Sequence, residues 1–168
     1  MIYGIRNRGN TCYAAAVIQC ICRILHCIPT DIIDLDKIPR VASDAQEFYE
    51  MIVSKIPILR HMVSAIVSDT VVPCILWSQL EEVREIGEVV CIRVDIQESI
   101  DNIRYMSIRG RKYRLLACVL LNNAHYRAIV ENNNNWFVCD DDNISVSDTT
   151  KNVHLYLLFY KYIPRSNV

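Results

Sequence analysis

Residues 4–13 read Gly4-Ile5-Arg6-Asn7-Arg8-Gly9-Asn10-Thr11-Cys12-Tyr13, and they place a cysteine where a turn rich in Gly and Asn meets an apolar helix. We expect Asn10 or Thr11 to cap that helix, which puts Cys12 in its first turn. Unpaired amide groups and the positive end of the helix dipole favour a thiolate there, so the local sequence predicts a reactive cysteine. After Cys12 the apolar residues recur at helical spacing, at Tyr13, Ala14, Val17, Ile18, Ile21, Ile24 and Leu25.

Size and charge restrict the classes of protein to consider. The chain has 168 residues, of which 52% are apolar, and its net charge is −1. A chain of this length fits one domain and buries about 70% of the surface of its unfolded state. The nearly neutral charge gives no reason to expect nucleic acid or an anionic membrane as a partner. The basic stretch Arg109–Arg114 is better explained as a solvated turn around Gly110.

The cysteines are numerous, but most of them interrupt apolar runs, as small core residues do. Paired CxxC spacings are absent, so we do not expect a structural zinc site. The sequence shows no signal peptide and no apolar run long enough to cross a bilayer. We therefore expect a reducing compartment, the cytosol or the nucleus, where disulfides are rare. The eight cysteines stand at positions 12, 20, 22, 27, 74, 91, 118 and 139.

Periodicity predicts helices first and strands afterwards. Ser43 and Gln46 form a capping-box pattern that opens a second helix, which Pro57 ends or kinks, and we expect further helix over 58–88. From Val89 onward, polar and apolar residues alternate, and the segments near 113–121, 125–131 and 153–161 have strand composition. This order predicts an α+β fold in one domain, helical over about 1–88 and β-rich over about 89–168. The buried face of the second helix is expected to comprise Ala45, Phe48, Met51, Ile52 and Ile56.

Four consecutive Asn residues, 132–135, predict a hairpin turn between two of these strands. A loop of those four residues puts Glu131 opposite Trp136 and Arg127 opposite Asp140. His125 then shares a sheet face with Asp140, with backbones about 7–8 Å apart on the diagonal. A slip of one residue would exchange Asp140 with its neighbour Asp141. The other face is expected to be the core side, with Tyr126, Ala128, Val130, Phe137 and Cys139.

These residues supply the parts of a thiol hydrolase. Cys12 would attack a carbonyl carbon, and His125 would hold the thiol proton and deliver it to the leaving amine. Asp140 would fix the orientation and tautomer of the imidazole. The side-chain amide of Asn7 and the backbone N–H of Cys12 are candidate donors to the oxyanion.

Each part also has a simpler explanation. Cys12 is one of many cysteines that could pack as small apolar residues, and three consecutive aspartates usually form a solvated turn. Arg127 could pair with Asp140 and leave His125 without a partner. The other histidines, His26, His61 and His154, stand in no comparable arrangement, so we assign them no role.

Several separated blocks together resemble the ubiquitin-specific protease family of papain-like cysteine peptidases. The resemblance touches most of the chain except roughly residues 57–88. Its blocks are Gly4–Tyr13 continuing into Gln19-Cys20-Ile21, Asp44-Ala45-Gln46-Glu47-Phe48, Tyr113-Arg114-Leu115, His125-Tyr126-Arg127-Ala128, Trp136–Asp142, and Tyr156-Leu157-Leu158-Phe159-Tyr160.

The resemblance implies a role for each matched residue. Cys12 would be the nucleophile, His125 the base, Asp140 the orienting carboxylate and Asn7 the oxyanion donor. Asp141 would assist as a second polar partner. The implied fold packs a helical thumb, with the helix of the nucleophile, against an antiparallel sheet called the palm.

The resemblance also implies a substrate. Asp44 and Glu47 match acidic positions that hold the extended, arginine-bearing tail of ubiquitin, and Tyr126 is expected to contact the same tail. The implied reaction is hydrolysis of the isopeptide or peptide bond after the C-terminal glycine of ubiquitin. Ubiquitin or ubiquitinated proteins are therefore the expected partners, without a cofactor, a metal, nucleic acid or a membrane.

The chain departs from the family pattern in ways that leave other functions open. The interval from Asp44 to His125 is short, and the CxxC pairs of the zinc-bearing fingers are absent. Ala124 replaces a glycine, and Ala14-Ala15-Ala16 replaces bulkier residues. Without fingers, the grip on ubiquitin is reduced, so the substrate could be a ubiquitin-like modifier or a polyprotein. A third possibility is a module that binds ubiquitin without cutting it.

Overall fold

The computed structural model describes residues 2–38, 44–56, 62–64, 87–147 and 150–164. Its helices are α1 (Cys12–Leu25), α2 (Pro29–Ile32) and α3 (Ala45–Val53), with two 3₁₀ turns, η1 (Leu35–Lys37) and η3 (Ile100–Ile103). Its strands are β1 (Met62–Ser64), β2 (Val89–Glu98), β3 (Tyr105–Ile108), β4 (Arg111–Asn122), β5 (His125–Asn132), β6 (Asn135–Asp140), β7 (Asn143–Val146) and β8 (Val153–Tyr162). The mixture of helices and a largely antiparallel sheet confirms the α+β class.

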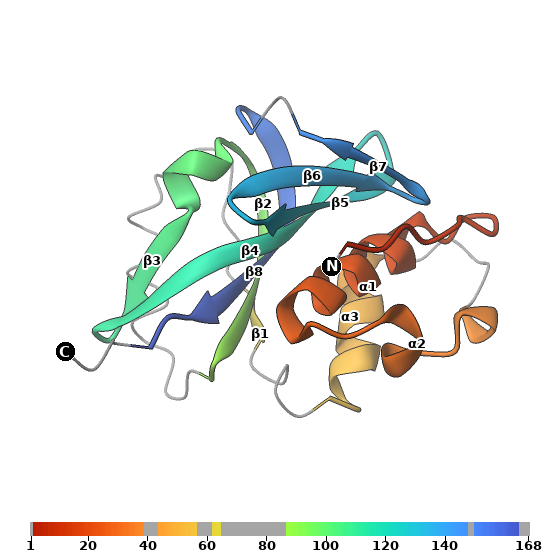
Figure 1. The fold of residues 1–168 in the computed structure, drawn as a ribbon, viewed down its shortest axis with the longest axis horizontal. Helices are drawn as coiled ribbons and strands as arrows, with labels where there is room; N and C mark the ends of the chain where they lie inside the picture. Colours follow the sequence, from red (N-terminus) through yellow and green to blue (C-terminus); the bar gives the residue numbers. More distant parts are fainter. Residues whose placement is uncertain (1, 39–43, 57–61, 65–86, 148–149, 165–168) are drawn as a thin grey trace.

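The strands form one eight-stranded sheet in the order β1-β2-β8-β4-β5-β6-β7, and β3 pairs with β4 outside this path. Every described pair is antiparallel except β1 with β2, which is parallel. Figure 1 shows α1, α2 and α3 grouped together beside the sheet. The helices therefore form one layer, which packs on one face of the sheet.

Helix α1 is more deeply enclosed than an amphipathic surface helix, because 11 of its 14 residues are buried. It packs against α2 and α3 on one side and against β4, β5 and β6 on the other. Ala14, Ala15 and Ala16 are at most 2% exposed, so their small side chains lie where the helix meets its neighbours. A helix surrounded in this way is apolar on nearly all sides, and in α1 the polar exceptions are Gln19 and Arg23.

Both faces of the sheet are buried, which differs from the single core side expected from the hairpin. The first core lies under α1 and α3 and includes the expected residues Ala128, Val130 and Cys139. A second core lies on the opposite face and contains Ile129 and Trp136. Residues of η3 and β3 complete that second core, so this region supplies its own cover. Alternation within the hairpin could not reveal this second core, because η3 and β3 lie outside the hairpin.

The Asn-rich hairpin has the predicted register. Glu131 pairs with Trp136 and Ala128 with Cys139. The loop is shorter than expected, because Asn132 and Asn135 also pair, which leaves Asn133 and Asn134 as the turn. Both have positive φ, 50° and 66°, as a tight hairpin turn requires and as asparagine tolerates.

Helix α3 begins one residue later than the capping-box pattern suggested. Its N-cap is Asp44, whose carboxylate accepts a hydrogen bond from the backbone N–H of Gln46 at 2.7 Å. The expected cap Ser43 lies outside the described residues. On the buried face, Met51 was wrongly included, since it is 41% exposed, whereas Tyr49 is fully buried.

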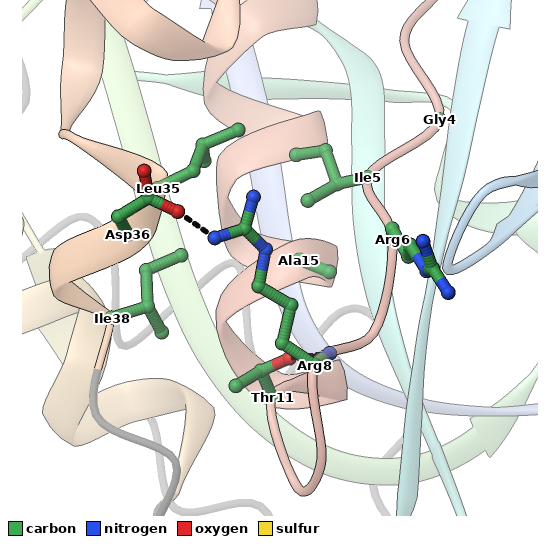
Figure 2. A pocket seen from close by; sticks show the side chains of 9 residues that line it. All are labelled: Gly4, Ile5, Arg6, Arg8, Thr11, Ala15, Leu35, Asp36 and Ile38. Carbon is green, nitrogen blue, oxygen red and sulfur yellow. Dashed lines mark hydrogen bonds and ion pairs between the residues drawn. The ribbon is translucent and has the colours of Figure 1, made fainter.

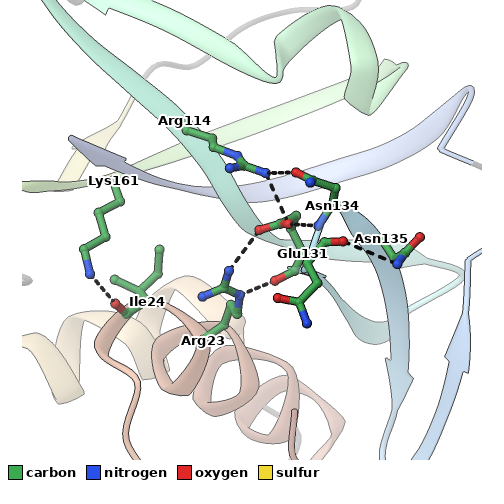
Figure 3. A network of polar contacts seen from close by, with 8 residues as sticks. Arg23, Ile24, Arg114, Glu131, Asn134, Asn135 and Lys161 are labelled. Atoms are coloured by element: carbon green, nitrogen blue, oxygen red, sulfur yellow. Dashed lines mark hydrogen bonds and ion pairs between the residues drawn. The ribbon is translucent and has the colours of Figure 1, made fainter. Parts of the chain in front are cut away.

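A buried carboxylate joins α1 to the β5–β6 hairpin, as Figure 3 shows. Glu131 is 2% exposed, and its carboxylate meets Arg23 of α1 at 2.9 Å and Arg114 of β4 at 3.2 Å. It also accepts a hydrogen bond from the backbone N–H of Asn134 at 2.6 Å. Arg23 donates a further bond to the backbone carbonyl of Glu131. A buried carboxylate with two cationic partners is well compensated, and it fixes the C-terminal half of α1 relative to the sheet.

The remaining differences concern short strands. β1 lies within the segment 58–88 where helix was expected, and the rest of that segment up to residue 86 is outside the described residues. Neither β3 nor β7 was expected from the sequence. The turn around Gly110 was expected and joins β3 to β4, with Arg109 and Gly110 at positive φ. Among the described helices, none is long and apolar enough to cross a membrane.

Candidate active site

The predicted cysteine stands at the start of the central helix. Cys12 is the first residue of α1, Thr11 is its N-cap, and Cys12 is half-buried. The Thr11 side chain makes no capping bond to the helix. Instead its hydroxyl accepts from the backbone N–H of Arg8 at 3.0 Å and donates to Oδ1 of Asn7 at 3.2 Å. Thr11 therefore ties the start of α1 to the turn that precedes it.

Asn7 is the centre of that turn. Its Oδ1 also accepts from the backbone N–H of Gly9 at 3.0 Å and of Thr11 at 3.3 Å. These donors fix which side of the amide is oxygen. The Nδ2 group points the other way and donates to Oδ2 of Asp141 at 3.1 Å. An amide NH₂ has two hydrogens, so a second donor remains for another acceptor.

The histidine predicted at the start of a strand faces a carboxylate. His125 is the first residue of β5, and its Nε2 lies 2.7 Å from Oδ1 of Asp140, the last residue of β6. Because Nε2 is engaged, Nδ1 is the ring nitrogen left to act as a base. Both side chains are about 40% exposed, at 40% and 42%, so the pair is open to a substrate. The alternative pairing of Asp140 with Arg127 is wrong, since no such contact exists among the described residues.

The turn between β6 and β7 brings these parts together. Asp141, at φ 54°, holds the N-terminal segment through three bonds: its carbonyl accepts from the N–H of Ile5 at 2.9 Å and from Nε2 of Gln19 at 2.8 Å, and its carboxylate accepts from Asn7. The segment passes so close that a Cβ added at Gly4 would lie 2.6 Å from the Asp142 carbonyl oxygen. Only glycine fits there without a shift of the backbone.

The expected second polar partner thus contacts Asn7 rather than the histidine. Asp141 has its other carboxylate oxygen, Oδ1, buried without a hydrogen-bond partner among the described residues. Ligand atoms of His125, Asp140 and Asp141 all lie within 4.8 Å of one another, the only group in the described part of the chain with the composition of a metal site. The same three groups are those expected to serve catalysis, so the cluster needs no ion to account for it.

Gln19 borders the candidate site, and although it stands in one of the blocks of the resemblance, no role was predicted for it. Its amide is 3% exposed and donates to two backbone carbonyls, of Asp141 at 2.8 Å and of Tyr3 at 3.1 Å. It therefore clamps the N-terminal segment between α1 and the β6–β7 turn. A polar residue inside an otherwise apolar helix was the available signal, because a buried amide needs partners.

A small pocket of about 130 Å³ lies beside the same N-terminal segment, and Figure 2 shows it from close by. Its lining is mixed: apolar side chains come from Ile5, Ala15, Leu35 and Ile38, and polar ones from Arg6, Arg8, Thr11 and Asp36. The guanidinium of Arg8 reaches across to the carboxylate of Asp36 in η1. Both side chains of this ion pair are exposed, so it contributes little stability.

The residues expected to hold a substrate tail lie at the start of α3, at Asp44 and Glu47, and on β5 next to His125, at Tyr126. Asp44 accepts hydrogen bonds from the hydroxyls of Tyr126 (2.9 Å) and Tyr156. Partial burial tends to raise the pKa of the Asp44 carboxyl, but bonds from Tyr156, Tyr126 and the start of α3 outweigh it and hold that pKa below its ordinary value. Burial, together with the bond to Asp44, raises the pKa of Tyr126. Glu47 is exposed one turn into α3.

A second histidine and aspartate pair was not expected. Nε2 of His154 on β8 contacts Oδ1 of Asp95 on β2. The prediction that His154 has no arrangement comparable to that of His125 is therefore wrong, because His154 also has an aspartate partner. No cysteine lines the pocket in which His154 stands, within the described part of the chain, so the pair lacks the nucleophile that Cys12 offers to the other site.

Comparison with known proteins identifies the fold. No family model and no curated protein matches the chain. Among solved structures, the chain is similar to the SAGA DUB module Ubp8/Sgf11/Sus1/Sgf73 bound to monoubiquitin, at 14% identity and a TM-score of 0.71, over 97% of this chain and 69% of that chain. The same module bound to ubiquitin aldehyde gives 12% identity and a TM-score of 0.72, over 97% and 70%.

A third similar structure is an essential yeast splicing factor, at 11% identity and a TM-score of 0.69, over 97% of this chain and 70% of that chain. Identities this low establish a shared fold and no more. Because the neighbours include both a DUB module and a splicing factor, the function of this chain has to be argued from its site.

Proposed function

We propose that the chain is a cysteine-type deubiquitinase with a papain-like mechanism. The observation that carries this proposal is the bond between His125 and Asp140, which leaves Nδ1 of the imidazole available as a base, while Asn7 in the turn before α1 bonds the adjacent Asp141. The resemblance in the sequence and the fold shared with ubiquitin-bound DUB structures support the same function. The substrate bond is the isopeptide or peptide bond after the C-terminal glycine of ubiquitin.

In the first step, the sulfur of Cys12 attacks the carbonyl carbon of that glycine, and Nδ1 of His125 holds the thiol proton. The carbonyl oxygen gains negative charge and accepts hydrogen bonds from Nδ2 of Asn7 and from the N–H of Cys12. Asp140 accepts from Nε2 and so stabilises the imidazolium. The C–N bond then breaks, and the imidazolium protonates the leaving amine.

In the second step, water hydrolyses the thioester between Cys12 and the glycine. Nδ1 of His125 takes the proton of the water, the C–S bond breaks, and the thiolate and a free C-terminal carboxylate result. Asp141 keeps Asn7 oriented through both steps, because it accepts one hydrogen of the Asn7 amide and leaves the other for the substrate. Asp44, Glu47 and Tyr126 contact the extended tail, and the reaction uses no cofactor or metal.

Hydrolysis of ubiquitin–aminomethylcoumarin by the purified chain tests this function. We expect turnover by the wild type and a fall of at least ~10³-fold in kcat for Cys12→Ala and for His125→Ala. Matched controls are Cys27→Ser, a half-buried cysteine just after α1, and His26→Asn, an exposed histidine. Both should keep wild-type turnover.

Calorimetric titration with ubiquitin measures binding, and together with the turnover assay it distinguishes the alternative functions. Binding without turnover by the wild type would identify a non-catalytic ubiquitin-binding module. Turnover of a ubiquitin-like modifier or a polyprotein junction, with none of ubiquitin, would retain the mechanism and replace the substrate. Equal turnover by the wild type and Cys12→Ala would reject the thiol mechanism.

A further inference from the structure

A polar pocket of about 210 Å³ lies where β2 and β4 end and where β5 and β8 begin. Its polar lining is the guanidinium of Arg127, the imidazole of His154 and the side-chain amides of Gln97, Asn122 and Asn152. The remaining lining is aliphatic and comes from β4 and β8. No lining residue carries a carboxylate, so the pocket presents hydrogen-bond donors and a positive charge.

Arg127 supplies the positive charge of this pocket. It is half-buried, and among the residues that the structure describes it makes no hydrogen bond or ion pair. The nearby carboxylate of Asp95 is already engaged by His154. A partly desolvated guanidinium without a partner favours an anion, and its planar fork matches a carboxylate with two parallel hydrogen bonds.

The pocket adjoins the candidate active site. Asn122, which lines the pocket, is the register partner of His125 across β4 and β5. Arg127 follows His125 by two residues on β5, so the two project from the same face, with Cα atoms roughly 6.5–7 Å apart. A ligand in the pocket would therefore lie beside the bond on which His125 acts.

We propose that this pocket is a subsite for an acidic side chain, Asp or Glu, of the protein substrate close to the scissile bond. The identity of the partner rests on the proposed function, whereas the binding chemistry rests on the pocket alone. Apart from the His154–Asp95 pair, the polar lining is one guanidinium and neutral amides, so it suits the single charge of a carboxylate and would leave a phosphate dianion uncompensated.

A binding experiment tests the pocket without any catalysis. Labelled protein is titrated with N-acetyl-glutamate methylamide and followed by NMR, with the glutamine analogue and inorganic phosphate as parallel probes. We expect saturable shifts at Asn122, Arg127 and His154 with the glutamate probe only, and none in Arg127→Gln. Absent saturation, equal response to the glutamine probe, or stronger response to phosphate would each overturn the proposal.

A cleavage experiment then tests the role of the pocket. Ubiquitin is linked through an isopeptide bond to peptides that carry Glu or Gln beside the lysine. We expect the wild type to prefer the Glu peptide by about tenfold in kcat/KM, mainly through KM. Arg127→Gln should lose this preference, whereas Arg109→Gln, at an exposed turn, should keep it.

The two experiments separate the two proposals. If the glutamate probe binds but neither peptide is cleaved, the proposed function fails and the carboxylate site stands. If both peptides are cleaved at equal rates by the wild type, the deubiquitinase stands and the subsite is rejected.

Discussion

Three consecutive aspartates, 140–142, have three different environments in this chain. Asp140 bonds the imidazole of His125, Asp141 bonds the amide of Asn7, and the side chain of Asp142 is exposed. The hairpin register in the sequence assigned Asp140 to the histidine, because Glu131 and Trp136 pair as predicted. The contact between Asp141 and Asn7 was not predictable, since it spans 134 residues and depends on how the N-terminal segment docks.

Replacement within this triplet gives a prediction at the level of single residues. Asp140→Asn should lower kcat by about 10²–10⁴-fold with little change in KM, because the amide no longer stabilises the imidazolium or its tautomer. Steady-state hydrolysis of ubiquitin–aminomethylcoumarin measures both constants. Asp142→Asn, the adjacent exposed position, is the control and should stay within about twofold of the wild type. A similar loss in both variants would mean that the turn, and not the carboxylate of Asp140, matters.

Contacts between residues far apart in the chain are the part of the site that could not be predicted from the sequence. The sequence did not predict that the carboxylate of Asp44 accepts hydrogen bonds from Tyr126 and Tyr156. Those tyrosines follow Asp44 by 82 and 112 residues, on β5 and β8. Strand periodicity predicts that each strand exists, but which strand lies beside the start of α3 depends on the order of strands in the sheet.

At the level of elements, the ionised carboxylate of Asp44 joins α3 to the sheet by accepting hydrogen bonds from two tyrosine hydroxyls. This predicts that the free energy of unfolding depends on pH. The pKa of Asp44 is lowered in the fold, so its contribution is present above the unfolded value, near pH 4, and is lost as pH falls through the folded pKa. We expect Asp44→Asn to cost about 1 kcal/mol in the free energy of unfolding at pH 7 and progressively less below about pH 4.

Urea unfolding at several pH values measures this difference. The control is Glu50→Gln, an exposed residue on the same helix, which should follow the wild type within about 0.5 kcal/mol at each pH. A cost for Asp44→Asn that stays constant from pH 7 to pH 3 would show that the charge of the carboxylate does not join α3 to the sheet.

The elements themselves were predictable where one signal dominated. α1 and β5 follow from periodicity, and the hairpin follows from its asparagines, which tolerate the positive φ of the turn. β7 escaped prediction because all four of its residues are exposed, so no burial pattern marks it. The cap of α3 was displaced by one residue, because Ser43 and Asp44 are both good N-caps and only the backbone geometry distinguishes them.

For the whole molecule, the sheet is the common support of two cores and of the candidate site. α1 and α3 cover one face, and η3 and β3 cover the other. The candidate site combines the start of α1 and the turn before it with the first residue of β5 and the last residue of β6, so separate regions of the chain contribute its parts. The fold shared with the DUB module extends over 97% of the chain.

The central claim is that the sulfur of Cys12 and the imidazole of His125 act together on the C-terminus of ubiquitin. The most direct measurement is mass spectrometry of the chain after reaction with ubiquitin that carries a C-terminal electrophile, followed by peptide mapping of the attachment. The account predicts one ubiquitin per chain, attached at Cys12 only, and no adduct with His125→Ala. An adduct at another cysteine, equal labelling of His125→Ala, or no adduct at all would contradict it.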